Sequence, residues 1–174
     1  WKLGEHNSWS KMTNYELDTR IPLIVRAPGF KANGSTTNAF VELVDIFPAL
    51  CDLSGLDIPE NLQGTSFKPV LQNPDMEWKS AAFSQYLRGR YHPVEGEQEY
   101  MGYAMRTDRF KFVEWYVWDP ENNVPLELAD TELYDCKTDP DENKNIAGLE
   151  ENQELVSQLS NKLKAGWKAS LPVF

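Results

Sequence analysis

The sequence predicts a mixed α/β chain whose second half is a small antiparallel sheet packed against a C-terminal helix. Three observations support this fold class. A short, uninterrupted apolar run at residues 21–25 is typical of a buried strand, and residues 81–118 are rich in β-branched and aromatic side chains. Leucines recur every four residues near the C-terminus. We therefore expect the end of an α/β domain at residues 1–78 and a C-terminal subdomain of sheet and helix at residues 79–174.

The first part begins with a loop. Residues 1–19 are polar and follow no regular period, so we expect a long ordered loop there. The apolar run Ile21–Val25 follows, and residues 41–44 can form a further strand. Because the run is short and uniformly apolar, it suits a strand buried on both faces of a parallel or mixed sheet.

One helix is expected between Asp45 and Gly55, and a shorter one near residues 67–71. Asp45 is a favoured N-cap residue, Pro48 is tolerated in a first turn, and Gly55 can end the helix. The apolar face of this helix is predicted to consist of Phe47, Leu50, Cys51 and Leu53.

The second part contains the expected sheet. Strands are predicted at residues 81–86, 100–106 and 110–118, with a hairpin turn at residues 107–109 and a short strand at residues 132–135. The amphipathic period then predicts a C-terminal helix of about four turns. Its apolar positions are Leu155, Leu159, Leu163 and Trp167.

Charge and composition exclude several classes of function. The 174 residues include 27 acidic and 17 basic side chains, which gives a formal net charge of −10. An acidic protein has no general positive field for nucleic acid or for an anionic membrane. No apolar run is long enough to span a bilayer, and no targeting signal is recognisable. Cys51 and Cys136 fit either a disulfide or two free thiols, without zinc-ligand spacing.

Residues 1–11 are the first candidate site. They contain a histidine, a glutamate, two tryptophans and two lysines. A lysine held among aromatic and hydrogen-bonding groups is a good receptor for sulfate or phosphate, since its ammonium offers three donors. The same composition also fits a loop in which both tryptophans pack and Lys11 is merely solvent-exposed.

Arg88, Arg90 and His92 form the second candidate. They alternate along the chain and share one face if the segment is extended. In so acidic a chain, this local basic cluster is suited to binding an anionic substrate. A solvated loop with basic side chains at its rim explains the pattern equally well.

Several catalytic motifs are absent from the sequence. There is no glycine-rich phosphate loop, no Gly-x-Ser-x-Gly turn and no evident nucleophile with its base. The chain by itself therefore does not describe a complete active site.

The motifs that are present resemble type I sulfatases of the alkaline-phosphatase superfamily, and among them iduronate-2-sulfatase-like enzymes. The opening loop matches at Trp1, Leu3, Gly4, Glu5, His6, Trp9 and Lys11. The resemblance continues through residues 21–24, 44–48, 53–56, 84–86, 101–107, 132–135 and 139–145. It covers essentially the whole chain, and the order of the motifs is its most specific feature.

The resemblance implies a role for several residues. Lys11 matches the lysine that contacts the substrate sulfate, and Trp1 matches an aromatic residue beside the metal ligands. His6 belongs to the same loop. With Arg88, Arg90 and His92 these residues form the predicted substrate-binding set; no catalytic residue and no metal ligand is predicted within the chain.

The resemblance also implies what the chain lacks. The family nucleophile is a formylglycine made within Cys/Ser-x-Pro/Ala-x-Arg, a motif that does not occur here, and Cys51 lies in a different context. Calcium and its ligands are expected upstream of Trp1. Since the chain begins with Trp1 rather than Met, we expect it to be a C-terminal portion that is inactive without its N-terminal part.

The predicted partners are that missing part and a sulfated carbohydrate of the glycosaminoglycan type. A periplasmic, extracellular or lysosomal location is implied. Two other functions stay open: a non-catalytic carbohydrate-binding or scaffold module derived from a sulfatase, and a phosphoester or phosphonate hydrolase of the same superfamily.

Overall fold

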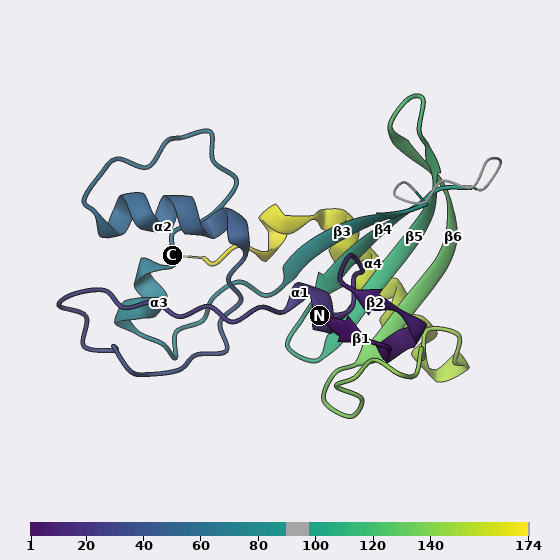
Figure 1. The fold of residues 1–174 in the computed structure, drawn as a ribbon, viewed down its shortest axis with the longest axis horizontal. Helices are drawn as coiled ribbons and strands as arrows, with labels where there is room; N and C mark the ends of the chain where they lie inside the picture. Colours follow the sequence, from purple (N-terminus) through teal and green to yellow (C-terminus); the bar gives the residue numbers. More distant parts are fainter. Residues whose placement is uncertain (90–97, 174) are drawn as a thin grey trace. The chain divides into compact units, whose positions relative to one another are not determined.

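The chain divides into two units, each built from segments that are distant in sequence. The computed structural model describes residues 1–89 and 98–173 (Figure 1). The first unit comprises residues 1–21 and 83–166, and the second comprises residues 22–82 and the segment that begins at Trp167. The N-terminal loop thus belongs to the same unit as the sheet, whereas the sequence division grouped it with residues 20–78. The assignment of residues 1–78 to a catalytic domain stays a prediction.

The first unit is organised around a four-stranded sheet with the order β3-β4-β5-β6. Its strands are β3 (Ala82–Arg88), β4 (Tyr100–Arg106), β5 (Phe110–Asp119) and β6 (Val124–Asp135). β5 pairs antiparallel with both β4 and β6. The expected turn between β4 and β5 is confirmed, because the Thr107 N–H donates to the Phe110 carbonyl at 2.9 Å.

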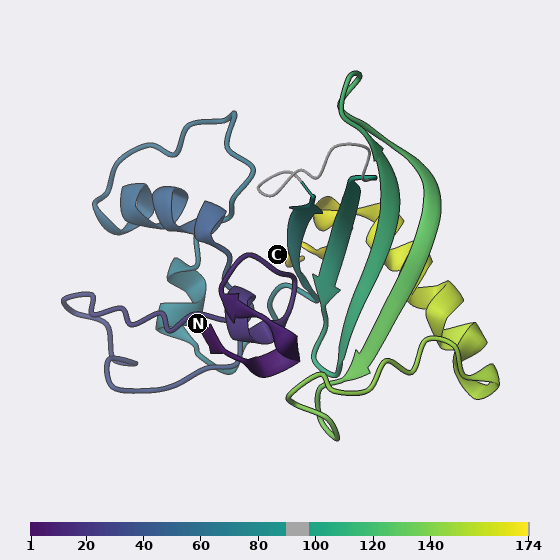
Figure 2. The ribbon, with the colours of Figure 1, turned by 45° about the vertical axis from the view of Figure 1, so that its right-hand side comes forward.

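Helix α4 (Gln153–Ala165) covers one face of this sheet, and the N-terminal segment covers the other (Figure 2). Glu114 of β5 accepts a hydrogen bond from Ser160 of α4 at 2.6 Å. Phe112 and its register partner Leu133 alternate in phase with Glu114 and are fully buried. The opposite face holds the buried cluster of Ala104, Val113 and Trp115. The predicted antiparallel sheet with its packed C-terminal helix is therefore confirmed.

Two boundaries differ from the sequence expectation. β6 begins at Val124 rather than at residue 132, and its first seven residues are all exposed. Val124, Leu126 and Leu128 alternate with other residues along this part of the strand, a period that the sequence prediction did not use. Helix α4 ends at Ala165, because Gly166 adopts a positive φ of 77° that a continuing helix does not allow. Trp167 therefore lies in the following 3₁₀ turn, Trp167–Ser170.

The second unit is held together by a small apolar core between two helices. Helix α2 (Ile46–Leu53) supplies Ala49, while Phe67 and Val70 come from the start of α3 (Lys68–Gln72). Both helices lie where they were expected, and Gly55 with a φ of 70° follows the end of α2.

Asp45 does not cap α2 with its side chain, which corrects the expectation. The carboxylate is fully buried and lies 2.7 Å from the Lys79 ammonium. It also accepts backbone N–H groups of Glu42 and Thr65, each at 2.8 Å. Asp45 is thus the centre of a buried ionic cluster that ties three segments of the unit together.

The two strands expected in this unit are not formed. In the described part of the chain, residues 21–25 pair with no strand, and residues 41–44 run into the 3₁₀ turn Leu43–Asp45. Val25 and Val41 turn toward the core, whereas the Ile24 side chain is 93% exposed. The predicted apolar face of α2 is also exposed at Phe47 and Leu50, and its buried residues are Pro48, Ala49 and Cys51.

Both cysteines are free thiols. None of the helices described is long and apolar enough to cross a membrane.

Candidate functional site

The N-terminal loop folds into a small, strained hairpin. β1 (Lys2–Leu3) pairs antiparallel with β2 (Trp9–Ser10), and a 3₁₀ turn at Glu5–Asn7 connects them. Positive φ angles occur here at residues other than glycine, a conformation that is kept only where the surroundings enforce it. These residues are His6, Asn7, Ser10 and Met12. Strain concentrated on both sides of Lys11 marks the hairpin as a candidate site.

A buried lysine anchors the hairpin from within. The Lys2 side chain is fully buried, where its ammonium pairs with the Asp18 carboxylate and lies 3.2 Å from the Thr13 hydroxyl. The Thr13 hydroxyl also donates to Asp18. Since Asp18 belongs to the short helix α1 (Glu16–Thr19), this triad joins the first strand to the end of the loop. Sequence reasoning assigned Lys2 no role.

A buried amide docks the loop onto the sheet. The Asn14 side chain donates to the Gly102 carbonyl of β4 at 3.0 Å and accepts from the Ser84 hydroxyl of β3 at 3.3 Å. A Cβ atom on Gly102 would lie only 2.7 Å from the Asn14 amide nitrogen. Gly102 therefore has to be glycine for the loop to approach this closely.

The hairpin exposes both of its tryptophans and Lys11 to solvent. Trp1 is 71% exposed, Trp9 is 70% exposed, and Lys11 is exposed as well. Both tryptophans are therefore free of packing partners on most of their surface. The hairpin therefore offers a cation and two aromatic rings to solvent, the side-chain types that bind an anionic sugar.

The His6 side chain is partly buried. Its ring stacks on Tyr15, with ring centroids 3.9 Å apart and an interplanar angle of 10°. Tyr15 in turn packs against Tyr134 of β6 at 6.1 Å. Burial and the nearby carboxylate of Glu132 raise the pKa of the Tyr134 hydroxyl, so the hydroxyl stays protonated. Glu5 accepts the Leu3 N–H at 2.6 Å, which lowers its pKa.

A buried carboxyl group lies beneath helix α1. Glu142 accepts the backbone N–H of Glu16 at 2.7 Å, and burial raises its pKa to about 7. Glu16 pairs with Lys111 at 3.3 Å and with Arg106 at 3.4 Å. These two basic residues are thus paired with a carboxylate inside the unit.

The second predicted cluster is described only at its first member. Arg88, at the end of β3, is exposed and stacks over the Trp115 ring with its guanidinium carbon 4.9 Å from the ring centroid. Arg90 and His92 lie outside the described residues.

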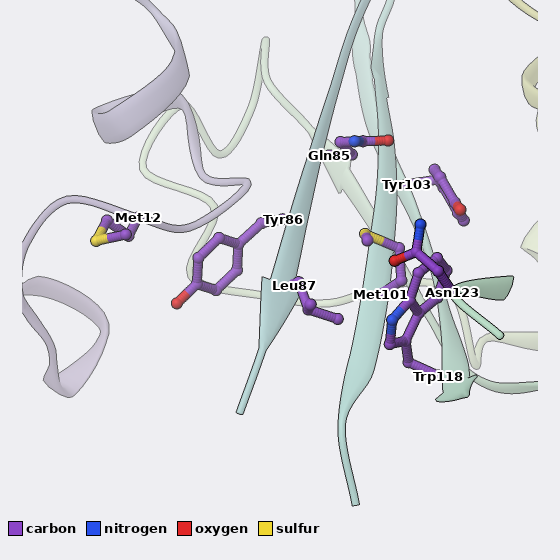
Figure 3. A pocket seen from close by; sticks show the side chains of 8 residues that line it. All are labelled: Met12, Gln85, Tyr86, Leu87, Met101, Tyr103, Trp118 and Asn123. Atoms are coloured by element: carbon purple, nitrogen blue, oxygen red, sulfur yellow. The ribbon is translucent and has the colours of Figure 1, made fainter. Parts of the chain in front are cut away.

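A cavity of about 440 Å³ is lined by Met12, the residue that follows Lys11, and by residues of the sheet unit. Sequence analysis did not predict this cavity. Figure 3 shows that Met12 and Tyr86 lie on one side of β3 and the other lining residues on the opposite side. Aromatic rings and the side-chain amides of Gln85 and Asn123 can contact the apolar faces and hydroxyl groups of a sugar. The remaining lining residues are Leu87, Met101, Tyr103 and Trp118.

Within residues 1–89 and 98–173, no three histidine, cysteine, aspartate or glutamate side chains cluster in a way that would hold a metal ion. The resemblance places the calcium ligands upstream of Trp1, so calcium stays a prediction.

Most of the sequence of this chain matches a known protein family. The family model described as N-sulphoglucosamine sulphohydrolase, C-terminal, matches residues 4–169. This range contains the hairpin beyond Leu3, the whole sheet and helix α4.

Curated relatives are sulfatases by name. N-acetylglucosamine-6-O-sulfatase of Bacteroides thetaiotaomicron is 34% identical over 98% of this chain and 29% of its own length. Arylsulfatase K of Canis lupus familiaris is 32% identical over 92% of this chain and 28% of its own. Iduronate 2-sulfatase of Mus musculus is 26% identical over 91% and 38%, respectively. The chain thus spans less than two fifths of each of these relatives.

Solved structures agree in fold. A protein solved in complex with its substrate D-glucosamine-2-N,6-O-disulfate has a TM-score of 0.74 and 34% identity, covering 97% of this chain and 33% of that one. Phosphonate monoester hydrolase of Agrobacterium radiobacter has a TM-score of 0.51 and 27% identity over 70% of this chain and 23% of its own.

Proposed function

Because the chain belongs to the sulfatase family, we propose that it is the C-terminal portion of an enzyme that hydrolyses sulfate esters of carbohydrates. The family model that matches it is described as N-sulphoglucosamine sulphohydrolase, C-terminal. The observation that carries the proposal is the match over residues 4–169, which includes Lys11 and the Asn14–Gly102 anchor of its loop.

In this proposal Lys11 binds the sulfate group of the substrate. Negative charge on the sulfate oxygens and on the leaving alkoxide increases as the S–O bond breaks, and a fixed ammonium stabilises that charge. Preorganisation is essential to this effect, because a mobile lysine would lose its advantage over water. The buried triad of Lys2, Thr13 and Asp18 and the Asn14–Gly102 bond supply it by holding both ends of the hairpin.

Trp1 and Trp9 are proposed to line the substrate pocket around Lys11, because both are exposed beside it. His6 holds the turn of the hairpin in place by stacking on Tyr15. Arg88 is proposed to bind a more distant part of the sugar, and the same role stays a prediction for Arg90 and His92.

The nucleophile and the metal are proposed to come from outside this chain. A formylglycine and calcium remain part of the proposal only as groups supplied by other residues, since the described side chains hold neither. We accordingly expect the isolated chain to be inactive.

The second unit supports the proposal that further residues of the same protein pack here. Among the described residues, the extended segment 21–25 has no strand partner, and several apolar side chains of this unit are exposed to solvent. Exposed large apolar side chains in this number suggest a surface that another part of the protein covers. The exposed side chains include Leu23, Ile24, Leu43, Val44, Phe47, Leu50, Leu56 and Ile58.

The substrate is proposed to be a sulfated sugar of the glycosaminoglycan type. The names of the relatives include both a glucosamine derivative and iduronate, and the glucosamine-directed enzyme has the higher identity of the two. A periplasmic, extracellular or lysosomal location is proposed with it.

The test is sulfate release by the full-length protein from a panel of defined sulfated oligosaccharides. Release that depends on Lys11 supports the proposal. Hydrolysis of phosphate or phosphonate esters without sulfate release would favour the alternative chemistry of the superfamily. Saccharide binding without any hydrolysis would favour a non-catalytic module.

A further inference from the structure

The stack of Arg88 on Trp115 is built from more than these two side chains. Arg88 is exposed at the end of β3, whereas Trp115 is buried in the middle of β5. A guanidinium that lies on an aromatic face uses that face for the stack and keeps the N–H groups at its edge free to donate. The stack therefore restricts where Arg88 points without consuming its hydrogen bonds.

Trp115 is held in one orientation by Glu132. Its indole N–H donates to one carboxylate oxygen of Glu132 at 2.9 Å, and the Tyr134 hydroxyl donates to the other at 3.2 Å. Both oxygens of Glu132 are thus occupied by neutral donors within the sheet.

Gly102 makes room for the indole. It is the register partner of Trp115, and a Cβ atom at this position would lie 2.6 Å from the ring carbon Cζ3. The ring therefore lies flat against the backbone of β4, where any other residue would displace it.

Arg88 differs in charge balance from four other basic residues of this unit. Lys2, Arg106, Arg109 and Lys111 each pair with a carboxylate. Among residues 1–89 and 98–173, no carboxylate lies within ion-pair distance of Arg88. In a chain with a net charge of −10, an oriented guanidinium that pairs with no carboxylate of the described residues is suited to an external anion.

We infer that Arg88 binds an anionic group of the sugar other than the sulfate that is hydrolysed, and that Trp115, Glu132 and Gly102 are positioning residues that act through it. The group is an oxyanion, either a carboxylate or a second sulfate. This inference rests on the proposed function, since it assigns part of the substrate of the same enzyme.

The test is a double-mutant cycle in the full-length protein. Trp115→Leu and Arg88→Ala are each expected to raise KM about threefold to thirtyfold for a sulfated disaccharide that carries a second anion, the range expected for one cation–π contact. The double variant is expected to be no worse than Arg88→Ala alone. Two substrate arms, one with a uronate carboxylate and one with a second sulfate, identify the anion.

Three controls separate positioning from general damage. A small aryl sulfate, which has no second anion, should be turned over normally by every variant. Phe112→Leu removes a buried ring from the other face of β5 and should leave KM unchanged. Glu132→Ala should raise KM as Trp115→Leu does, whereas Glu132→Gln, which keeps an acceptor for the indole, should restore it.

The inference is overturned if the two single effects multiply in the double variant, or if the aryl sulfate suffers equally. Its failure is distinguishable from failure of the proposed function. If the wild-type protein releases no sulfate at all, the equilibrium affinity for the same disaccharides still measures the contribution of Arg88 to binding. Equal affinity of wild type and Arg88→Ala for the doubly anionic sugar would then refute it.

Discussion

In the proposed function, Lys11 is the residue on which substrate binding depends most directly. In the full-length enzyme, Lys11→Ala is expected to lower kcat/KM about ten- to a thousandfold, the range for removing one preorganised charge contact. Steady-state kinetics on a sulfated saccharide measure this. Lys144→Ala is the matched control, since it removes another exposed lysine. Equal rates for wild type and Lys11→Ala would remove Lys11 from the site.

Lys2 is expected to matter for stability rather than for charge at the site. Lys2→Met leaves the buried Asp18 carboxylate without its partner, which is expected to cost about 3–5 kcal/mol of unfolding free energy. Urea denaturation followed by fluorescence measures the loss. Lys11→Met serves as the control with the same change of side chain at an exposed position. A loss below about 1 kcal/mol for Lys2→Met would show that the triad does not anchor the hairpin.

At the scale of elements, helix α1 rests on a carboxyl group whose protonation changes near neutrality. The pKa of Glu142 is raised to about 7 by burial. Because the folded state holds this proton more tightly than the unfolded state, Glu142 favours folding at low pH, and this advantage is lost as the pH rises from about 4.5 to 7. The total change is at most about 3 kcal/mol.

Glu142→Gln is expected to remove this pH dependence. The amide keeps an oxygen that can accept the Glu16 N–H and does not ionise. Between pH 5 and 8 the wild type should lose stability relative to the variant, as measured by urea denaturation at each pH. Parallel curves for the two proteins would contradict the buried, protonated state of Glu142.

Strand β4 carries the tightest packing constraint between the loop and the sheet. Gly102→Ala places a methyl group against both the Trp115 ring and the Asn14 amide, and it is expected to destabilise the protein by about 1–3 kcal/mol. Thermal unfolding measures this. Gly148→Ala is the control, because a Cβ atom there meets nothing within 4 Å. Similar melting temperatures for the two variants would mean that the loop does not dock as described.

The elements that the sequence predicted correctly are those whose packing partners lie within this chain. β4 and β5 pair with each other, and β5 buries residues 111–115 in succession because both of its faces are covered, so their apolar and aromatic composition indicates strands directly. Residues 21–25 have the pattern of a strand but no strand to pair with in the described chain. A pattern indicates what a segment can bury, not whether its partner belongs to the same stretch of sequence.

The candidate site was predictable only in part, for a similar reason. Lys11 and Trp1 were identified through a resemblance to a family, and the structure places both on an exposed hairpin. Lys2, Asn14 and Glu142 gave no signal, because a buried polar residue is recognisable only by its partners. Those partners lie up to 126 residues away, as with the bond between Glu16 and Glu142.

At the scale of the whole molecule, the second unit is expected to be completed by residues outside this chain. In the full-length protein, Ile24→Asp should lower the melting temperature strongly, although this side chain is 93% exposed here. Val173→Asp, at a side chain that is 99% exposed, is the control and should have little effect. Differential scanning calorimetry compares them. If both variants melt like the wild type, the apolar surface of this unit stays in solvent.

The central claim is that this chain helps to bind the sulfate of a carbohydrate sulfatase. The most direct measurement is sulfate release from defined sulfated oligosaccharides by the full-length protein and by its Lys11→Ala variant. The account predicts release by the wild type and a loss of at least about tenfold in the variant. Absence of sulfate release from every saccharide, or equal release by both proteins, would contradict it.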